Sequence, residues 1–213
     1  MTFPIQLTVL RIVLVPVFFI LFAVVTPAAT GWAVVVFVLA AASDWWDGYM
    51  ARAMKLTSPL GAFLDPLADK LLTGSAFVAF AMRGYIVWWM ALLVIGRDLY
   101  LTIFRVASDA NGLPLKTSYF AKVKTFVQMT FIALMLAALV AQQGTLGVLL
   151  EHVASYLLLS NVLYWSMSIV TFLTVISALM YSYDNWPVLR ATVQRYLLRR
   201  TPQGIHRAPG ESI

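Results

Sequence analysis

The sequence contains no cysteine, and only 11% of its residues are charged. Without cysteine there are no disulfide bonds, no thiolate nucleophile and no thiolate metal site. A soluble domain usually carries about 25% charged residues. The low charge, together with 62% apolar residues, therefore indicates an integral membrane protein.

The net charge of +6 does not indicate a nucleic-acid-binding protein. The basic residues lie at the ends of apolar runs and in the C-terminal tail, rather than along one polar surface. We expect them to set the membrane topology and to contact anionic lipids, with no nucleic acid as a partner.

Long apolar runs predict an all-α membrane protein with six transmembrane helices, because a span takes roughly 20 residues. The runs cover about residues 7–25, 31–54, 60–82, 85–106, 119–140 and 149–181. The last run is longer than one span needs, so its first part, up to about Ser160, is expected to be interfacial or a separate short helix. The first run lacks a basic leader and a small-residue cleavage site, so we expect it to be retained.

These runs form one predicted domain, residues 1–184, followed by a basic cytoplasmic tail, residues 185–213, that is partly disordered. No repeat is evident. Almost all basic residues outside the tail fall on one side of the predicted spans, and only Arg83 falls on the other. The positive-inside rule then places both termini in the cytoplasm, which predicts a multi-pass protein of the bacterial inner membrane.

Four aspartates lie beside the apolar runs: Asp44, Asp47, Asp65 and Asp69. Each pair is spaced by three or four residues, so on a helix its members share one face. Residues 53–60 are typical of a break between two helices, which would bring both pairs to one place. Near the bilayer centre four aspartates would cost on the order of 10 kcal/mol if nothing compensated them. A divalent cation is the simplest compensation, because carboxylate oxygens suit Mg²⁺, Mn²⁺ and Ca²⁺.

A second polar group is basic and consists of Arg97, Arg105, Lys116, Lys122 and Lys124. An acidic metal site beside a basic pocket suits reactions of phosphates, because metals neutralise phosphoryl oxygens and cations hold a second phosphate. The alternative is a cation or proton transporter that uses the same carboxylates.

The pattern Asp44-x2-Asp47-Gly48-x2-Ala51-Arg52-x8-Gly61-x3-Asp65-x3-Asp69 fixes eight positions. This pattern resembles the signature of the CDP-alcohol phosphotransferase family and matches it at each of these positions. The resemblance implies a six-helix membrane enzyme that works with a divalent metal, Mg²⁺ or Mn²⁺, bound as two ions. It also implies a homodimer.

The resemblance further implies roles for single residues. Asp44, Asp47 and Asp65 would bind the metal, and Asp69 would do so while taking the proton from the acceptor hydroxyl. The CDP group would be bound by Gly48, Arg52 and Gly61 together with Asp47. The phosphate of the acceptor would be bound by Arg97, Arg105, Lys122 and Lys124.

Several segments resemble one branch of that family, the bacterial phosphatidylglycerophosphate synthases: QLTVLRIVLVPVF, DWWDG, GAFLDPLADK, IGRD and FAKVKTFVQM. That branch implies transfer of a phosphatidyl group from CDP-diacylglycerol to sn-glycerol 3-phosphate, with CMP released. Asp98 stands where many members of the branch have glutamate, and the pair Arg97–Asp98 also resembles cardiolipin synthases. Phosphatidylglycerol or an inositol phosphate therefore remain alternative acceptors.

Overall fold

The computed structural model describes the backbone of residues 3–54, 59–110, 112–113, 115, 119–144 and 147–200. It describes the side chains of residues 8–43, 67–110, 112–113, 115, 120, 123–144 and 147–194. Its helices are α1 Phe3–Ala23, α2 Pro27–Met54, α3 Pro59–Met82, α4 Trp88–Ala110, α5 Tyr119–Ala141, α6 Val148–Leu159, α7 Asn161–Asp184 and α8 Trp186–Arg200.

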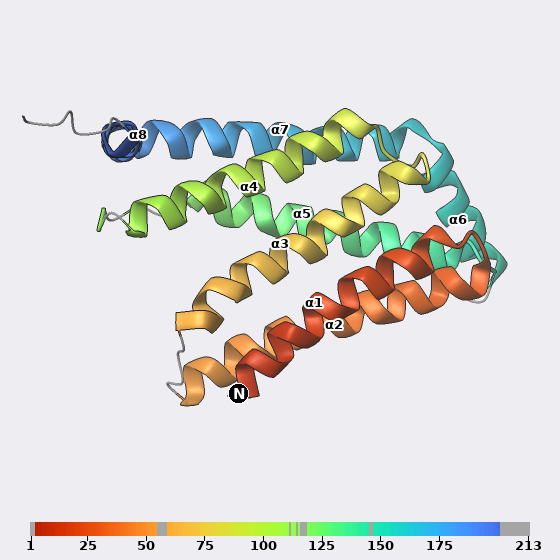
Figure 1. Ribbon diagram of the computed structural model, residues 1–213. Coiled ribbons are helices and arrows are strands. Elements are labelled where there is room, and N and C mark those ends of the chain that lie inside the picture. Colours follow the sequence, from red (N-terminus) through yellow and green to blue (C-terminus); the bar gives the residue numbers. More distant parts are fainter. Residues whose placement is uncertain are drawn as a thin grey trace, which may run out of the picture.

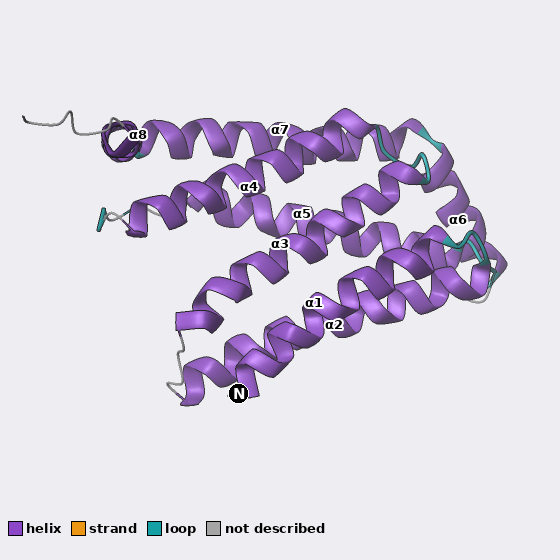
Figure 2. Ribbon diagram, in the orientation of Figure 1, coloured by secondary structure: helices purple, strands orange, loops and turns teal. Residues whose placement is uncertain are grey.

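The long helices run lengthwise beside one another, and short connections join them (Figure 2). Helix α1 packs against α2 and α3, while α4 packs against α3 and α7. Figure 1 shows α6 at one end of the bundle, between the ends of α5 and α7. Helix α8 lies at the opposite end and is turned across the direction of α7. The start of α1, the end of α2 and the start of α3 share that end with α8.

Aromatic side chains hold the aspartate-bearing helices to their neighbours. Phe18 of α1 packs on Phe37 of α2 with ring centroids 5.3 Å apart, and Phe22 meets Phe80 of α3 at 5.7 Å. All four rings are buried. Such pairs contribute about 0.5–1.5 kcal/mol each beyond the area they bury. These contacts fix α2 and α3 against α1, at positions farther from the α2–α3 connection than the aspartates.

Helix α1 begins at Phe3 and ends at Ala23, a few residues before the predicted run 7–25, and two other predicted boundaries were wrong. Residues 26–30 were expected to be a turn, but α2 begins at Pro27. The Thr26 hydroxyl accepts a hydrogen bond from the Ala29 amide at 3.3 Å, and proline suits the first helical position because its missing N–H would have no partner there. At the other boundary α4 begins at Trp88 rather than Tyr85, because Gly84, with φ +75°, ends α3 in a turn.

The interruption predicted near Ser160 is confirmed, because α6 ends at Leu159 and α7 begins at Asn161. The Ser160 hydroxyl accepts a hydrogen bond from the Val162 amide and caps α7. The sequence did not predict that the tail begins with a helix, α8. Residues 201–213 lie outside the described residues.

Two described helical segments are long and apolar enough to cross a membrane, Val123–Ala141 and Asn161–Asp184. Residues 8–23, 27–43 and 148–159 form shorter apolar helices. The fold is thus all-helical with apolar helices suited to a membrane. Six transmembrane helices remain a prediction, since α2, α3 and α4 carry charged residues within their length.

Arg83, at the end of α3, connects three helices at the end of the bundle away from α8. Its guanidinium donates to the Thr30 hydroxyl at 3.1 Å and to the Val24 carbonyl at 3.0 Å, and it lies 4.1 Å from the centre of the Phe22 ring. We expect Arg83→Ala to destabilise the protein by about 2 kcal/mol, because these contacts are lost together. Thermal unfolding of the purified protein in detergent measures this. Arg190→Ala, at an exposed arginine, is the control, and equal melting temperatures for both variants would contradict the prediction.

Candidate active site

The backbone arranges the four aspartates of the predicted metal site as two cross-helix pairs near the facing ends of α2 and α3. Asp44 lies ten residues before the end of α2, and Asp69 lies ten residues after the start of α3. Asp47 and Asp65 lie seven and six residues from the same two helix ends. Since each helical residue advances about 1.5 Å, the members of each cross-helix pair lie at matching distances from the α2–α3 connection.

The structure does not describe the side chains of Asp44, Asp47, Asp65 and Arg52. The surroundings of Gly48 and Gly61 are also outside the described residues. The convergence of the aspartates on one ion therefore stays a prediction that the backbone register supports. Among the described side chains no group of three or more acids, histidines or cysteines could hold a metal.

Asp69 is the one predicted metal ligand whose side chain is described. The Lys70 ammonium donates to Asp69 Oδ2 at 2.8 Å, and the Thr73 hydroxyl donates to the Asp69 carbonyl at 3.1 Å. Both members of the ion pair are about one quarter exposed. Adjacent residues on a helix point in different directions, so this pair forms only because the long lysine chain turns back. The sequence analysis did not assign Lys70 to the site, although a cation directly after the last signature aspartate was visible.

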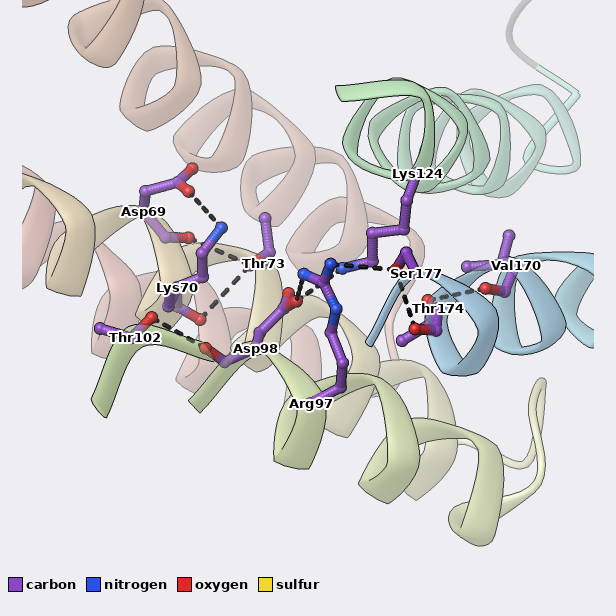
Figure 3. Close-up of polar contacts among 10 residues, drawn as sticks. All are labelled: Asp69, Lys70, Thr73, Arg97, Asp98, Thr102, Lys124, Val170, Thr174 and Ser177. Carbon is purple, nitrogen blue, oxygen red and sulfur yellow. Dashed lines mark hydrogen bonds and ion pairs between the residues drawn. The ribbon is translucent and has the colours of Figure 1, made fainter. Parts of the chain in front are cut away.

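Two of the predicted acceptor residues, Arg97 and Lys124, meet on a carboxylate that was not assigned to the site. Asp98 Oδ1 accepts from Arg97 at 2.9 Å and from Lys124 at 2.6 Å. The side chains of Arg97, Asp98 and Lys124 are only 10%, 6% and 2% exposed. Arg97 also donates to the hydroxyl of Ser177 at 2.9 Å, so the cluster joins α4, α5 and α7 (Figure 3).

The other two predicted acceptor residues are not in this cluster. Arg105 lies two turns after Asp98 on α4 and is exposed. Lys122 lies in the first turn of α5, and its side chain is outside the described residues. Asp98 follows Arg97 directly in the sequence, but spacing alone could not have placed Lys124 or Ser177 beside this pair.

A cavity of about 440 Å³ connects the two polar groups. Its walls come from α1, α3, α4 and α5 and are almost entirely apolar. The polar side chains that line it are Lys70, Thr73, Ser75, Asp98 and Gln128. Leu71 and Leu99 also line it, and both are more than two fifths exposed, so the cavity opens at the side of the bundle. One cavity is thus lined both by Lys70, the partner of Asp69, and by Asp98, the centre of the second cluster.

The sequence model of the CDP-alcohol phosphatidyltransferase family matches residues 1–176. The chain belongs to this family. A probable phosphatidylglycerophosphate synthase of Mycobacterium tuberculosis is 38% identical to it over 133 residues, which are 60% of this chain and 62% of that protein. The chain thus matches less than two thirds of the length of the mycobacterial protein.

Two further relatives are each named CDP-diacylglycerol–glycerol-3-phosphate 3-phosphatidyltransferase. The one from Yersinia enterocolitica is 39% identical over 131 residues, which are 59% of this chain and 71% of that protein. The one from Blochmanniella floridana is 32% identical over 171 residues, which are 78% of this chain and 90% of that protein. The last alignment extends well beyond the signature, so the similarity is not confined to one motif.

Family members generally depend on a divalent metal, and the residues of this chain fit one. All four positions supply carboxylate oxygens, which suit Mg²⁺ and Mn²⁺ better than zinc, for which histidine and cysteine are the usual ligands. The Asp69 carboxylate is paired with the ammonium of Lys70 in this structure.

Proposed function

We propose that this chain transfers the phosphatidyl group of CDP-diacylglycerol to sn-glycerol 3-phosphate and releases CMP. The observation that carries the proposal is one cavity lined both by Lys70, which pairs with Asp69, and by Asp98, which pairs with Arg97 and Lys124. A base, a basic pocket and a route for a lipid chain then lie together. The names of the relatives support glycerol 3-phosphate as the acceptor.

Each polar group has one task in this reaction. Asp44, Asp47, Asp65 and Asp69 hold one or two divalent ions, which when bound neutralise the pyrophosphate and make CMP a better leaving group. Gly48, Arg52 and Gly61, with Asp47, bind the CDP group. The Asp69 carboxylate accepts the proton of the acceptor hydroxyl, whose oxygen forms the new bond to the phosphatidyl phosphorus as the bond to CMP breaks.

The cavity binds part of the lipid. Its apolar walls suit an acyl chain, and its opening beside Leu71 and Leu99 lets the chain enter from the bilayer. Its polar lining at Lys70 and Thr73 lies next to Asp69, so a lipid placed here has its headgroup directed to the base.

The proposed enzyme crosses the bacterial inner membrane with six helices and has its active site and both termini in the cytoplasm. The described helix ends support this topology, because the start of α1 and helix α8 lie at the same end of the bundle (Figure 1). A homodimer is proposed by analogy with the family.

An acceptor assay tests the proposed reaction. Purified enzyme is given CDP-diacylglycerol, Mg²⁺ or Mn²⁺, and one radiolabelled acceptor at a time. We expect glycerol 3-phosphate to yield a labelled lipid and an equal amount of CMP. A lipid product only with phosphatidylglycerol or an inositol phosphate would show another acceptor. Ion flux in liposomes without any release of CMP would show a transporter instead.

Arg105 is proposed to bind the acceptor phosphate as it enters. We expect Arg105→Ala to raise the KM for glycerol 3-phosphate about 10-fold, because a charge-assisted contact to phosphate is lost, and to change the KM for CDP-diacylglycerol much less. Steady-state kinetics with each substrate varied in turn measures both constants. Arg190→Ala, which removes an equally exposed arginine from α8, is the control. An equal rise in both constants would remove Arg105 from the acceptor pocket.

A further inference from the structure

We propose that Asp98 is a positioning residue that assembles the binding site for the acceptor's phosphate group, by holding Arg97 and Lys124 on one carboxylate oxygen. The proposal rests on the function proposed above and assigns the acceptor specificity of that site to a residue outside the family signature. Asp98 itself binds cations of the protein rather than the substrate.

The geometry shows why an acid is needed at this position. Arg97 comes from α4 and Lys124 from α5, and both donate to the same atom, Asp98 Oδ1. Two cations repel each other, and burial penalises each of them further. The carboxylate between them offsets both effects, so the two donors can lie side by side within the protein before any substrate arrives.

The charge of the cluster points to an anionic ligand. Among the described side chains two cations share one acid, which leaves one excess positive charge on groups that are at most 10% exposed. In addition, Nε of Arg97 is buried and has no hydrogen-bond acceptor among the described residues. A cluster that served only to join helices would be expected to balance its charge and satisfy its donors, because unpaired buried donors are costly. A phosphate monoester would supply both the missing charge and the missing acceptor.

The position of the cluster fits the acceptor rather than the nucleotide. Asp98 lines the same cavity as Lys70 and Thr73, which contact Asp69. Because Arg97 and Lys124 are both bound to Asp98, a phosphate that they hold lies close to this cavity, which Lys70 borders beside the proposed base. Gln128, one turn after Lys124 on α5, also lines the cavity.

Ser177 of α7 fixes the direction of the Arg97 guanidinium. Its hydroxyl accepts from Arg97 at 2.9 Å and donates to the Thr174 carbonyl at 2.9 Å, so both roles of the hydroxyl are used. Arg97 is held at one end by Asp98 and at the other by Ser177 (Figure 3). Ser177 is therefore a second, weaker positioning residue for the same site.

The kinetic test replaces Asp98 at nearly constant volume. We expect Asp98→Asn to raise the KM for glycerol 3-phosphate at least about 10-fold, with less than about a 2-fold change in the KM for CDP-diacylglycerol. Asp98→Glu keeps the charge, and we expect it to recover most of the loss. A merely structural role would lower the yield of folded enzyme or kcat without separating the two KM values. Equal KM values for the acceptor in Asp98→Asn and the wild type would overturn the proposal.

A second variant serves if Asp98→Asn does not fold. Ser177→Ala is expected to raise the KM for glycerol 3-phosphate about 3-fold, because Arg97 loses one of its two fixed partners. Ser168→Ala is the matched control, since its hydroxyl is exposed on the same helix and donates only to the Tyr164 carbonyl. Equal acceptor KM values for these two serine variants would also overturn the proposal.

A binding measurement separates this proposal from the proposed reaction. Inorganic phosphate is added to the purified protein, and the melting temperature is followed as phosphate increases. We expect stabilisation of the wild type and of Ser168→Ala, and markedly weaker stabilisation of Asp98→Asn. If the acceptor assay shows an acceptor other than glycerol 3-phosphate, the proposed reaction fails, but Asp98-dependent protection by phosphate would still support the site. Equal stabilisation of the wild type and of Asp98→Asn by phosphate would overturn the proposed role of Asp98.

Discussion

Replacement of Asp69 by asparagine is expected to lower kcat by about 10²- to 10⁴-fold, the range that a positioned general base contributes. The amide has nearly the volume of the carboxylate but cannot accept the proton of the acceptor hydroxyl. It also cannot form the ion pair that Asp69 makes with Lys70 at 2.8 Å. Pre-steady-state measurement of CMP release, at saturating CDP-diacylglycerol and acceptor, reports this step directly.

Two comparisons separate loss of the base from other effects of the Asp69 substitution. Asp109→Asn changes an exposed acid on α4 and should leave kcat unchanged. Lys70→Met removes the same ion pair while leaving the carboxylate in place, so it should lower kcat much less than Asp69→Asn does. If Asp69→Asn kept more than a tenth of the wild-type kcat, or if Lys70→Met were equally impaired, Asp69 would not be the base.

Asp65→Asn is expected to lower kcat/KM at least about 100-fold while leaving the protein folded. Substitution of a group that only supports a metal ligand typically lowers metal affinity or activity 10- to 100-fold. Substitution of a direct ligand should lower activity at least as much. The substitution removes one negative charge at nearly constant volume. Activity measured over a range of Mg²⁺ and Mn²⁺ concentrations tests this, because the remaining activity should need more metal.

A thermal measurement makes the Asp65 prediction independent of turnover. A metal that binds only the folded protein raises the melting temperature as its concentration increases. We expect this rise in the wild type and in Asp109→Asn, and a smaller rise in Asp65→Asn. An unchanged metal dependence of both activity and melting temperature would exclude Asp65 as a ligand, and with it the proposed metal site.

Much of the architecture could be predicted because its signals are local. Apolar runs gave the approximate position of the long helices, and the excess length of the last run indicated the division near Ser160 between α6 and α7. Errors arose where a single residue changed the backbone. Pro27 was interpreted as part of a turn, although proline can equally begin a helix when a residue such as Thr26 caps it.

The basic pocket was only partly predictable. Arg97 and Lys124 were chosen for their charge, and the structure brings them together. Arg105 was chosen on the same grounds and is exposed. Charge alone does not show which cation turns inward, because that depends on how α4 rotates against α5 and α7.

The sequence by itself determined that this is an apolar chain without cysteine, with eight signature positions of which four are aspartates, whose carboxylate oxygens suit a divalent ion. These follow from residue types and short spacings. Only the tertiary structure decided that Asp98 joins Lys124, which is 26 positions away, and that Arg97 reaches Ser177, which is 80 positions away. Such contacts depend on the packing of three helices, because the free energy of burying a charge is recovered only where a partner from another helix lies within hydrogen-bond distance.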